Sequence, residues 1–134
     1  MSTTKHKILI VDDEPDIREL IEYNLKKEGY QVYTASNGQE GVTEAKRVLP
    51  DLIILDIMMP KMNGIELCRA MIDKLGIKTL PVIVVSAISE KSKIISEFHD
   101  LPLPTKAFIR KPLETQDLLA KIKEMIGESE PAKG

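Results

Sequence analysis

The chain has 134 residues, of which 43% are hydrophobic and 30% charged, and its 19 basic and 21 acidic residues give a formal net charge of −2. This size and composition fit one soluble globular domain and exclude a general electrostatic attraction to nucleic acid or an anionic membrane. The single cysteine, Cys68, excludes an internal disulfide, and no apolar run approaches the ~18 residues of a membrane span, so we expect a cytoplasmic domain in a reducing compartment.

The first half of the chain predicts two short strands, each followed by an amphipathic helix. The strands are residues 7–11, which are β-branched, and residues 31–35, which alternate. The acids and proline of residues 12–15 suit a first helical turn, and residues 37–40 have the pattern of a capping box. Apolar spacing gives the inner faces of the helices as Ile17, Leu20, Ile21 and Leu25 in the first, and Val42, Ala45, Val48 and Leu49 in the second.

The second half predicts three further strands and three further helices. Residues 51–60, DLIILDIMMP, hold a fully apolar strand that ends at Asp56, and residues 81–86 and 107–109 are also strand-like. A third helix ends at Gly76, and a clear last helix ends at Ile126. Residues 89–98 predict a fourth helix with a poor apolar stripe, and the two prolines in residues 101–105 exclude a regular helix there.

Strands that alternate with helices predict an α/β fold, with a parallel sheet covered by helices on both faces. We expect residues 7–127 to form this domain, residues 1–6 to be an N-terminal tail, and residues 128–134 to be a flexible tail or the start of a linker. Sheets of this kind place their sites outside the carboxyl ends of the strands.

Polar residues stand where the predicted strands end. They are Asp12 and Asp13, Asp56, Ser86 and Lys111. Three carboxylates with no histidine or cysteine nearby predict a Mg²⁺ site, and a lysine and a hydroxyl beside it would bind phosphoryl oxygens. The chain has no serine–histidine pair and no glycine-rich phosphate loop, so the remaining nucleophile is Asp56, whose carboxylate can form an aspartyl phosphate.

These motifs, in this order, resemble the response-regulator receiver domain of two-component signalling, over roughly residues 7–126. The matching pieces are Asp12-Asp13 after KILIV, Asp56 in LDIMMPKMNG, Ser86-Ala87 after VIVV, and Lys111-Pro112. The resemblance implies a flavodoxin-like, doubly wound five-stranded sheet of order 2-1-3-4-5, like that of a single chemotaxis-type receiver.

The resemblance also implies a role for each matched residue. Asp56 would accept phosphoryl, Ser86 would bind a phosphoryl oxygen and move on activation, and Lys111 would pair with the phosphate. Asp13, Asp56 and the backbone carbonyl of Met58 would bind Mg²⁺ (or Mn²⁺), with Asp12 acting largely through water. The remaining implied roles are a cis peptide before Pro112 and an aromatic switch at Phe108, which lacks the hydroxyl of the more frequent tyrosine.

A receiver domain would be a bacterial-type signalling switch that catalyses only its own phosphorylation and slow dephosphorylation. The expected partners are a sensor histidine kinase or histidine phosphotransfer protein, and a downstream protein target or output domain that binds the helix 4–strand 5–helix 5 face. A phosphorylation-dependent dimer is a further candidate. Direct binding to nucleic acid or membrane is not expected. The sequence does not distinguish a free-standing receiver from a fragment of a larger regulator.

Two departures from the family pattern carry expectations. Pro104-Thr105 stand where the family usually has a Gly-Ala pair, so we expect a short or partly unwound fourth helix and a proline-containing loop after it. Met58 and Ile88, each two residues past a site residue, are apolar and cannot orient a water molecule. We therefore expect a long-lived phosphoryl group.

Three other functions compete with this interpretation. A pseudo-receiver would act as a constitutive interaction module, and a dehalogenase-type phosphatase would need a second aspartate at the position of Met58. Flavin binding would need a Ser/Thr/Gly-rich loop in place of the acids after the first strand. Plain structural roles are expected for Cys68 and Met59 in the core and for His6 and His99 at the surface, and capping or turn roles are the alternative for the three aspartates.

Overall fold

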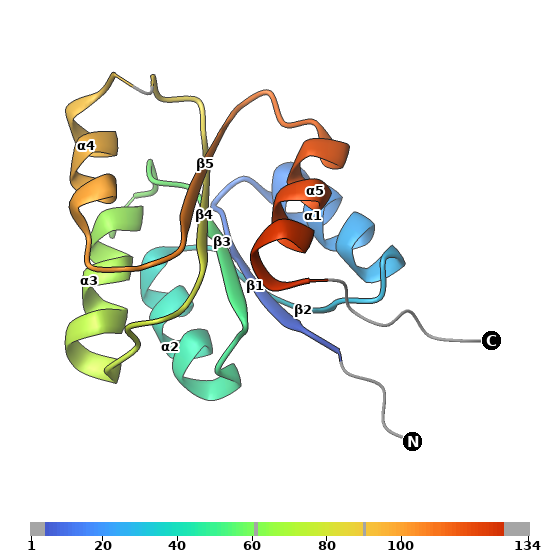
Figure 1. The fold of residues 1–134 in the computed structure, drawn as a ribbon, viewed down its shortest axis with the longest axis horizontal. Coiled ribbons are helices and arrows are strands. Elements are labelled where there is room, and N and C mark those ends of the chain that lie inside the picture. Colours follow the sequence, from blue (N-terminus) through green and yellow to red (C-terminus); the bar gives the residue numbers. More distant parts are fainter. Residues whose placement is uncertain (1–4, 61, 90, 128–134) are drawn as a thin grey trace.

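The computed structural model describes residues 5–60, 62–89 and 91–127, so the predicted terminal segments lie largely outside the described residues. Five parallel strands form one sheet of order β2-β1-β3-β4-β5, as predicted. Helices cover both of its faces (Figure 1). The strands are β1 (Lys7–Val11), β2 (Gln31–Ala35), β3 (Leu52–Leu55), β4 (Val82–Ser86) and β5 (Lys106–Arg110). The helices are α1 (Pro15–Lys27), α2 (Gly38–Val48), α3 (Gly64–Leu75), α4 (Lys93–Asp100) and α5 (Thr115–Ile126).

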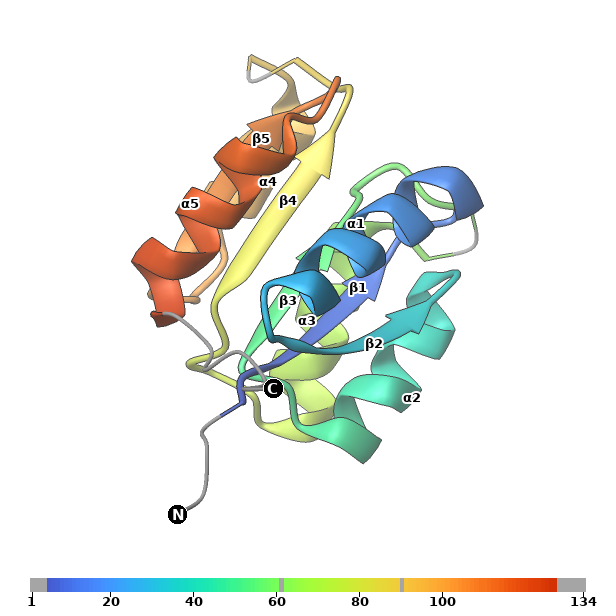
Figure 2. The same ribbon diagram turned by 90° about the vertical axis from the view of Figure 1, so that its right-hand side faces the viewer.

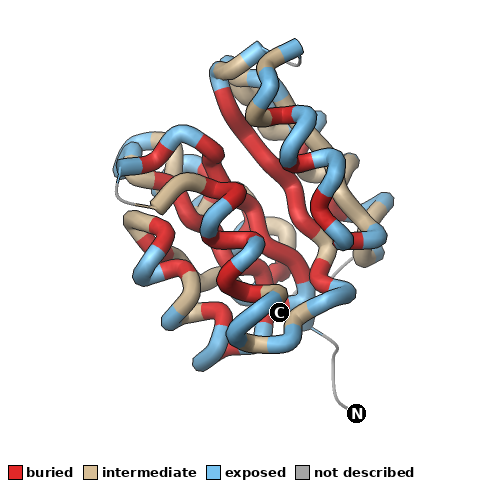
Figure 3. Tube along the Cα trace, turned by 90° about the vertical axis from the view of Figure 1, so that its left-hand side faces the viewer, coloured by how far each residue is buried: buried red, intermediate tan, exposed pale blue. Residues whose placement is uncertain are grey.

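The two faces of the sheet bury separate apolar clusters, because side chains alternate along each strand. Leu9, Ile53 and Val84 belong to the cluster that packs against α2, α3 and α4, whereas Ile10 and Ile54 belong to the cluster that packs against α1 and α5. Figure 2 shows α1 and α5 together on one side of the strands. The central strands are buried along their length (Figure 3), which explains why β3 and β4 are almost continuously apolar in sequence.

Two local predictions about the first two helices are wrong, and a third is confirmed only in part. Leu20 is 46% exposed and Leu49 is 68% exposed, so neither belongs to an inner face. Leu49 lies at the C-cap of α2 with φ 52°, a left-handed conformation that turns its side chain away from the helix stripe. The predicted capping box is half formed. The Asn37 side chain caps α2 by accepting from the N–H of Glu40 at 2.9 Å, but the Glu40 carboxylate accepts from the backbone N–H of Ser36, 3.0 Å away, rather than from that of Asn37 as a complete capping box requires.

Helix α4 is short, as expected, but its apolar stripe is better than the sequence indicated. It begins at Lys93 rather than near residue 89, and Ile95 and Phe98 are fully buried beside α3. The Lys106 ammonium binds the carbonyl groups at the end of the helix. It donates to the carbonyl oxygens of Phe98 at 3.2 Å and Leu101 at 2.7 Å, and also to that of His99. A side chain of β5 therefore satisfies carbonyl groups at the end of α4.

The prolines after α4 lie in a loop whose leucines point inward. Leu101 and Leu103 are 4% and 5% exposed and belong to the cluster that packs against α2, α3 and α4. Cys68 and Met59 are also buried, as predicted, and His99 is exposed. None of the described helices is long and apolar enough to cross a membrane.

Candidate phosphoacceptor site

A pocket of about 350 Å³ lies at the carboxyl edge of the sheet, where β1, β3, β4 and β5 end. Its lining combines most of the residues that the sequence singled out. They are Asp13, Glu14, Asp56, Met58, Ser86, Ala87, Ile88 and Lys111. The parallel sheet explains this meeting of distant residues, because the carboxyl ends of all its strands lie on one edge.

Three carboxylates gather at this edge. Asp12, Asp13 and Asp56 each have one carboxylate oxygen that lies within 4.8 Å of the corresponding oxygens of the other two. Asp12 and Asp56 are only 3% and 5% exposed, whereas Asp13 lies nearer the surface. Such a cluster of buried like charges is tenable only where cations and hydrogen-bond donors compensate it.

Backbone hydrogen bonds fix the two buried aspartates. The backbone N–H of Asp56 donates to the Val11 carbonyl oxygen at 3.1 Å, which continues the pairing of β3 with β1 past the end of the strands. The Asp56 carboxylate in turn accepts from the N–H of Met58 at 3.0 Å, and that of Asp12 accepts from the N–H of Glu14 at 2.9 Å. Each carboxylate is therefore oriented by the turn that follows its strand.

Lys111 supplies the positive charge. Its backbone N–H donates to the Ser86 carbonyl oxygen at 2.8 Å, and the Lys111–Pro112 peptide bond is cis. The Nζ atom lies 2.6 Å from Glu14 Oε1, 2.9 Å from Asp56 Oδ2 and 3.5 Å from Asp12 Oδ2. Burial of the ammonium lowers its pKa, but the bonds to Glu14 and Asp56 and the nearby carboxylates outweigh burial and leave the pKa of Lys111 well above its usual value.

The remaining predicted residues occupy the rim and the adjoining strand. The Ser86 side chain is 1% exposed, and its hydroxyl accepts from the N–H of Ile88 at 3.3 Å. Met58 is 59% exposed at the pocket mouth. Phe108 is half-buried on β5. It packs against the apolar cluster that lies between the sheet and α2, α3 and α4.

Glu14 is a pocket residue to which the sequence analysis gave no site role. It stands directly after the Asp12-Asp13 pair, where an acid is equally suited to the first turn of α1. Nothing in the sequence indicates that its carboxylate would turn toward Lys111, which is 97 positions away in the chain.

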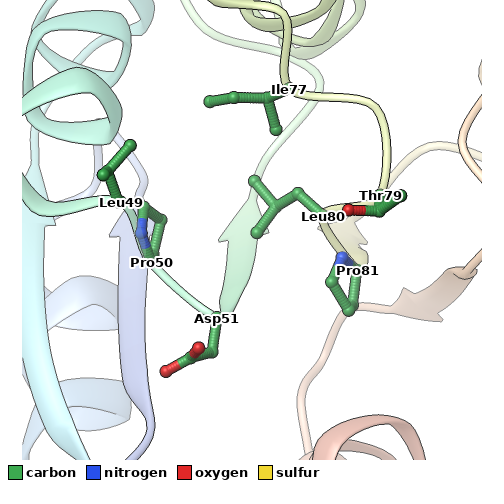
Figure 4. A pocket seen from close by; sticks show the side chains of 7 residues that line it. All are labelled: Leu49, Pro50, Asp51, Ile77, Thr79, Leu80 and Pro81. Carbon is green, nitrogen blue, oxygen red and sulfur yellow. The ribbon is translucent and has the colours of Figure 1, made fainter.

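A second pocket, of about 230 Å³, lies at the opposite edge of the sheet, before β3 and β4 (Figure 4). Leu49, Ile77, Leu80 and two prolines make its lining mostly apolar. Its carboxylate, Asp51, already accepts from the backbone N–H of Lys7 at 2.7 Å. This pocket therefore offers no cluster of charged groups comparable to that around Asp56.

The oxygen donors around Asp56 fit a hard divalent cation. Three carboxylates supply the ligand type that Mg²⁺ prefers, and the exposed side of the pocket leaves room for the water molecules that Mg²⁺ retains. A soft-metal site would need thiolates or imidazoles, and the described residues lining the pocket include neither.

The charge of Asp12 should make the metal-free protein less stable at neutral pH. Burial raises the pKa of Asp12, and the nearby charges of Asp56 and Glu14 raise it further. The hydrogen bond from the Glu14 N–H and the charge of Lys111 lower this pKa, but they do not cancel the rise. Because the folded state binds this proton more tightly than the unfolded state does, stability falls as pH rises through the folded-state pKa. In chelator at pH 7, we expect Asp12→Asn to raise the free energy of unfolding by on the order of 1 kcal/mol. Urea unfolding at pH 7 and at pH 3 checks this, since the gain should vanish at pH 3.

The fold and this edge together define a flavodoxin-like α/β domain with an acidic pocket and a lysine that reaches into it. The sequence model of the response regulator receiver domain matches residues 8–123, and the chain belongs to that family. Receiver domains are signalling domains of two-component systems rather than metabolic enzymes, and they bind Mg²⁺ at an acidic pocket. The family assignment sets aside the dehalogenase-type and flavin-binding alternatives.

Several known proteins are similar to this chain. The alkaline phosphatase synthesis transcriptional regulatory protein PhoP of Bacillus subtilis is 37% identical over 127 residues, which are 94% of this chain and 50% of PhoP. The chain thus spans about half the length of this curated relative. The structure of chemotaxis protein CheY4 of Vibrio cholerae superposes with a TM-score of 0.82 at 27% identity, covering 91% of this chain and 99% of CheY4. The N-terminal domain of a Wolinella succinogenes protein does so with a TM-score of 0.80 at 34% identity, covering 90% and 93%.

Proposed function

We propose that the protein is a phosphorylation-controlled switch in which Asp56 accepts a phosphoryl group from a phosphohistidine. The observation that carries the proposal is the environment of Asp56, a nearly buried carboxylate 2.9 Å from the Lys111 ammonium and beside two further aspartates. A carboxylate so oriented can act as a nucleophile, and the ammonium can neutralise charge on phosphoryl oxygens.

In the proposed transfer, one oxygen of Asp56 attacks the phosphorus of the donor. The new O–P bond forms as the P–N bond to the histidine breaks, and the electron pair of that bond leaves with the imidazole. The N–H of Met58 and the ammonium of Lys111 hold the Asp56 carboxylate in place for this attack. Ser86 stands across the pocket with a hydroxyl that can turn from the Ile88 N–H to bind a phosphoryl oxygen.

Asp13, Asp56 and the Met58 carbonyl would hold Mg²⁺, with Asp12 acting through water. When bound, the ion supplies positive charge for the phosphoryl oxygens. The switch would then run from Ser86 along β4 and β5, which are paired at Ser86 and Arg110, to Phe108 and the α4–β5–α5 face. That face would bind the downstream target or output domain.

The proposed donor is a sensor histidine kinase or a histidine phosphotransfer protein, and the proposed location is the cytoplasm. The Cys68 thiol suits a reducing compartment but has no redox role in this proposal, because burial raises its pKa to about 12, against a small lowering by Lys106, and keeps it protonated.

The direct test is incubation with Mg²⁺ and acetyl phosphate followed by intact mass measurement. We expect the wild type to gain one phosphoryl group and Asp56→Asn to gain none. Asp73→Asn, a change to an exposed aspartate on α3, is the matched control and should be phosphorylated like the wild type. An unmodified wild type would reject the proposal and favour a constitutive interaction module.

The residues at the pocket mouth should make the phosphoryl group long-lived. Met58 and Ile88 line the pocket and neither can orient an attacking water molecule. The double variant Met58→Asn/Ile88→Glu introduces groups that can, and we expect it to shorten the half-life of the aspartyl phosphate at least about tenfold. The decay of the phosphorylated mass after removal of the donor measures this. Rapid loss of phosphate from the wild type, with the same rate in the double variant, would contradict the expectation.

A further inference from the structure

Glu14 makes the shortest of the three ion pairs of Lys111. Its Oε1 lies 2.6 Å from Nζ, against 2.9 Å for Asp56 and 3.5 Å for Asp12. The Lys111 side chain is 12% exposed, whereas that of Glu14 is 57% exposed. The ammonium is thus held between an aspartate on the floor of the pocket and a glutamate at its open side.

Helix capping does not explain the position of the Glu14 carboxylate. Glu14 is the N-cap residue of α1, but its side chain makes no capping hydrogen bond. The backbone of Glu14 makes the local hydrogen bonds at the start of the helix. Its N–H donates to the Asp12 carboxylate at 2.9 Å, and its carbonyl oxygen accepts from the N–H of Arg18 at 3.0 Å. Among the described residues, the side-chain bond of Glu14 that the structure shows is the one to Lys111.

We propose that Glu14 is a displaceable counter-ion that competes with the phosphoryl group for the Lys111 ammonium. This inference rests on the proposed function. A phosphoryl group on Asp56 would extend into the same pocket that Glu14 and Lys111 line. The phosphoryl group and Glu14 would then compete for one ammonium that Asp12 also faces, and the phosphoryl group would gain a larger share of the charge of Lys111 when Glu14 releases it.

The difference in exposure makes Glu14 the carboxylate that leaves. Asp56 is covalently part of the phosphorylated group, and Asp12 is nearly buried and held by a backbone N–H. Glu14 has a long side chain at the surface and can rotate into solvent at little cost, because exposed ion pairs are weak. Glu14 is therefore a positioning residue. Before phosphorylation, Glu14 balances the positive charge of the Lys111 ammonium. The same contact lowers the affinity of the pocket for a phosphoryl group.

The probe for this inference is beryllium fluoride, which binds to an aspartate in place of a phosphoryl group without covalent transfer. Binding would be measured by calorimetry in saturating Mg²⁺. We expect Glu14→Gln, which removes the charge, to bind about two- to five-fold more tightly than the wild type, the size of an exposed ion pair. Glu14→Asp should show a similar gain, because it keeps the charge but is one methylene shorter and cannot reach Lys111 in the same way. Asp16→Asn removes a charge from the same helical turn without touching Lys111 and should bind like the wild type.

Each result decides the matter. A wild type that shows no binding dependent on Asp56 overturns the proposed function and the inference with it. If the wild type binds but Glu14→Gln binds no more tightly, only the inference fails. It also fails if Asp16→Asn gains as much as Glu14→Gln, or if Glu14→Asp behaves like the wild type, because either result would show that net charge acts rather than the contact with Lys111.

Discussion

Replacing Gly64 by alanine is expected to lower the free energy of unfolding by about 2–3 kcal/mol, the cost of forcing an extra methyl group into a packed region. Gly64 is the first residue of α3, and its N–H donates to the Ile57 carbonyl oxygen at 2.9 Å. A Cβ atom here would lie 2.6 Å from Leu55 Cδ1, 2.9 Å from the Asp56 carbonyl oxygen and 2.9 Å from Ile57 Cα. The leucine side chain can move, but the two backbone atoms belong to the segment that carries Asp56.

Urea unfolding of the variant measures this effect, with Gly76→Ala as the matched control. Gly76 closes α3 at φ +67°, and a Cβ atom there would meet nothing within 4 Å. That substitution should cost only about 1–2 kcal/mol, for the left-handed backbone conformation. A loss in Gly64→Ala no larger than that in Gly76→Ala would show that the Asp56 segment can shift freely, and it would contradict the close packing described here.

The turn at Gly64 also shows where the sequence was informative and where it was not. Asn63 and Glu66 form a complete capping box that begins α3, whereas a capping box was predicted only at residues 37–40. Both stretches have an asparagine followed three residues later by a glutamate. Which glutamate accepts from the backbone N–H of its N-cap residue depends on the path of the preceding chain, and Glu40 accepts from the Ser36 N–H instead.

The parallel sheet and the position of the site residues at the ends of its strands followed from the sequence pattern, whereas the strand order that makes those residues neighbours was implied by the family resemblance. The short apolar run of β3, closed by a turn signal, is typical of a buried strand, and the carboxyl edge of the parallel sheet brings Asp56 and Lys111 together. The orientation of exposed side chains has no such determinant. The turn of Glu14 toward Lys111 and the closure of α4 by Lys106 both depend on long side chains that choose among several partners in three dimensions.

Replacing Lys111 by methionine should have a large effect on the metal-free protein. The side chains of Lys111, Asp12 and Asp56 are 12%, 4% and 7% exposed, so the substitution leaves two buried carboxylates without their cation. Removing one partner of a buried ion pair is strongly destabilising, and we expect the free energy of unfolding in chelator at pH 7 to fall by about 2–3 kcal/mol. Lys91→Met, which removes the same charge from an exposed loop, is the matched control and should change it by less than about 0.5 kcal/mol.

The pH and Mg²⁺ dependence of that loss separates electrostatics from packing. Burial already raises the pKa of Asp12, and without the opposing charge of Lys111 that carboxyl keeps its proton to still higher pH in the folded state. The folded state then binds more protons than the unfolded state, and stability declines as pH rises. The deficit of Lys111→Met should therefore be greatest near neutral pH and small near pH 3. Mg²⁺ would replace the missing charge, so its addition should stabilise the variant more than the wild type. Thermal unfolding with and without Mg²⁺ at both pH values measures these differences. A deficit independent of pH and Mg²⁺ would mean that the aliphatic part of Lys111, rather than its ammonium, supports the pocket.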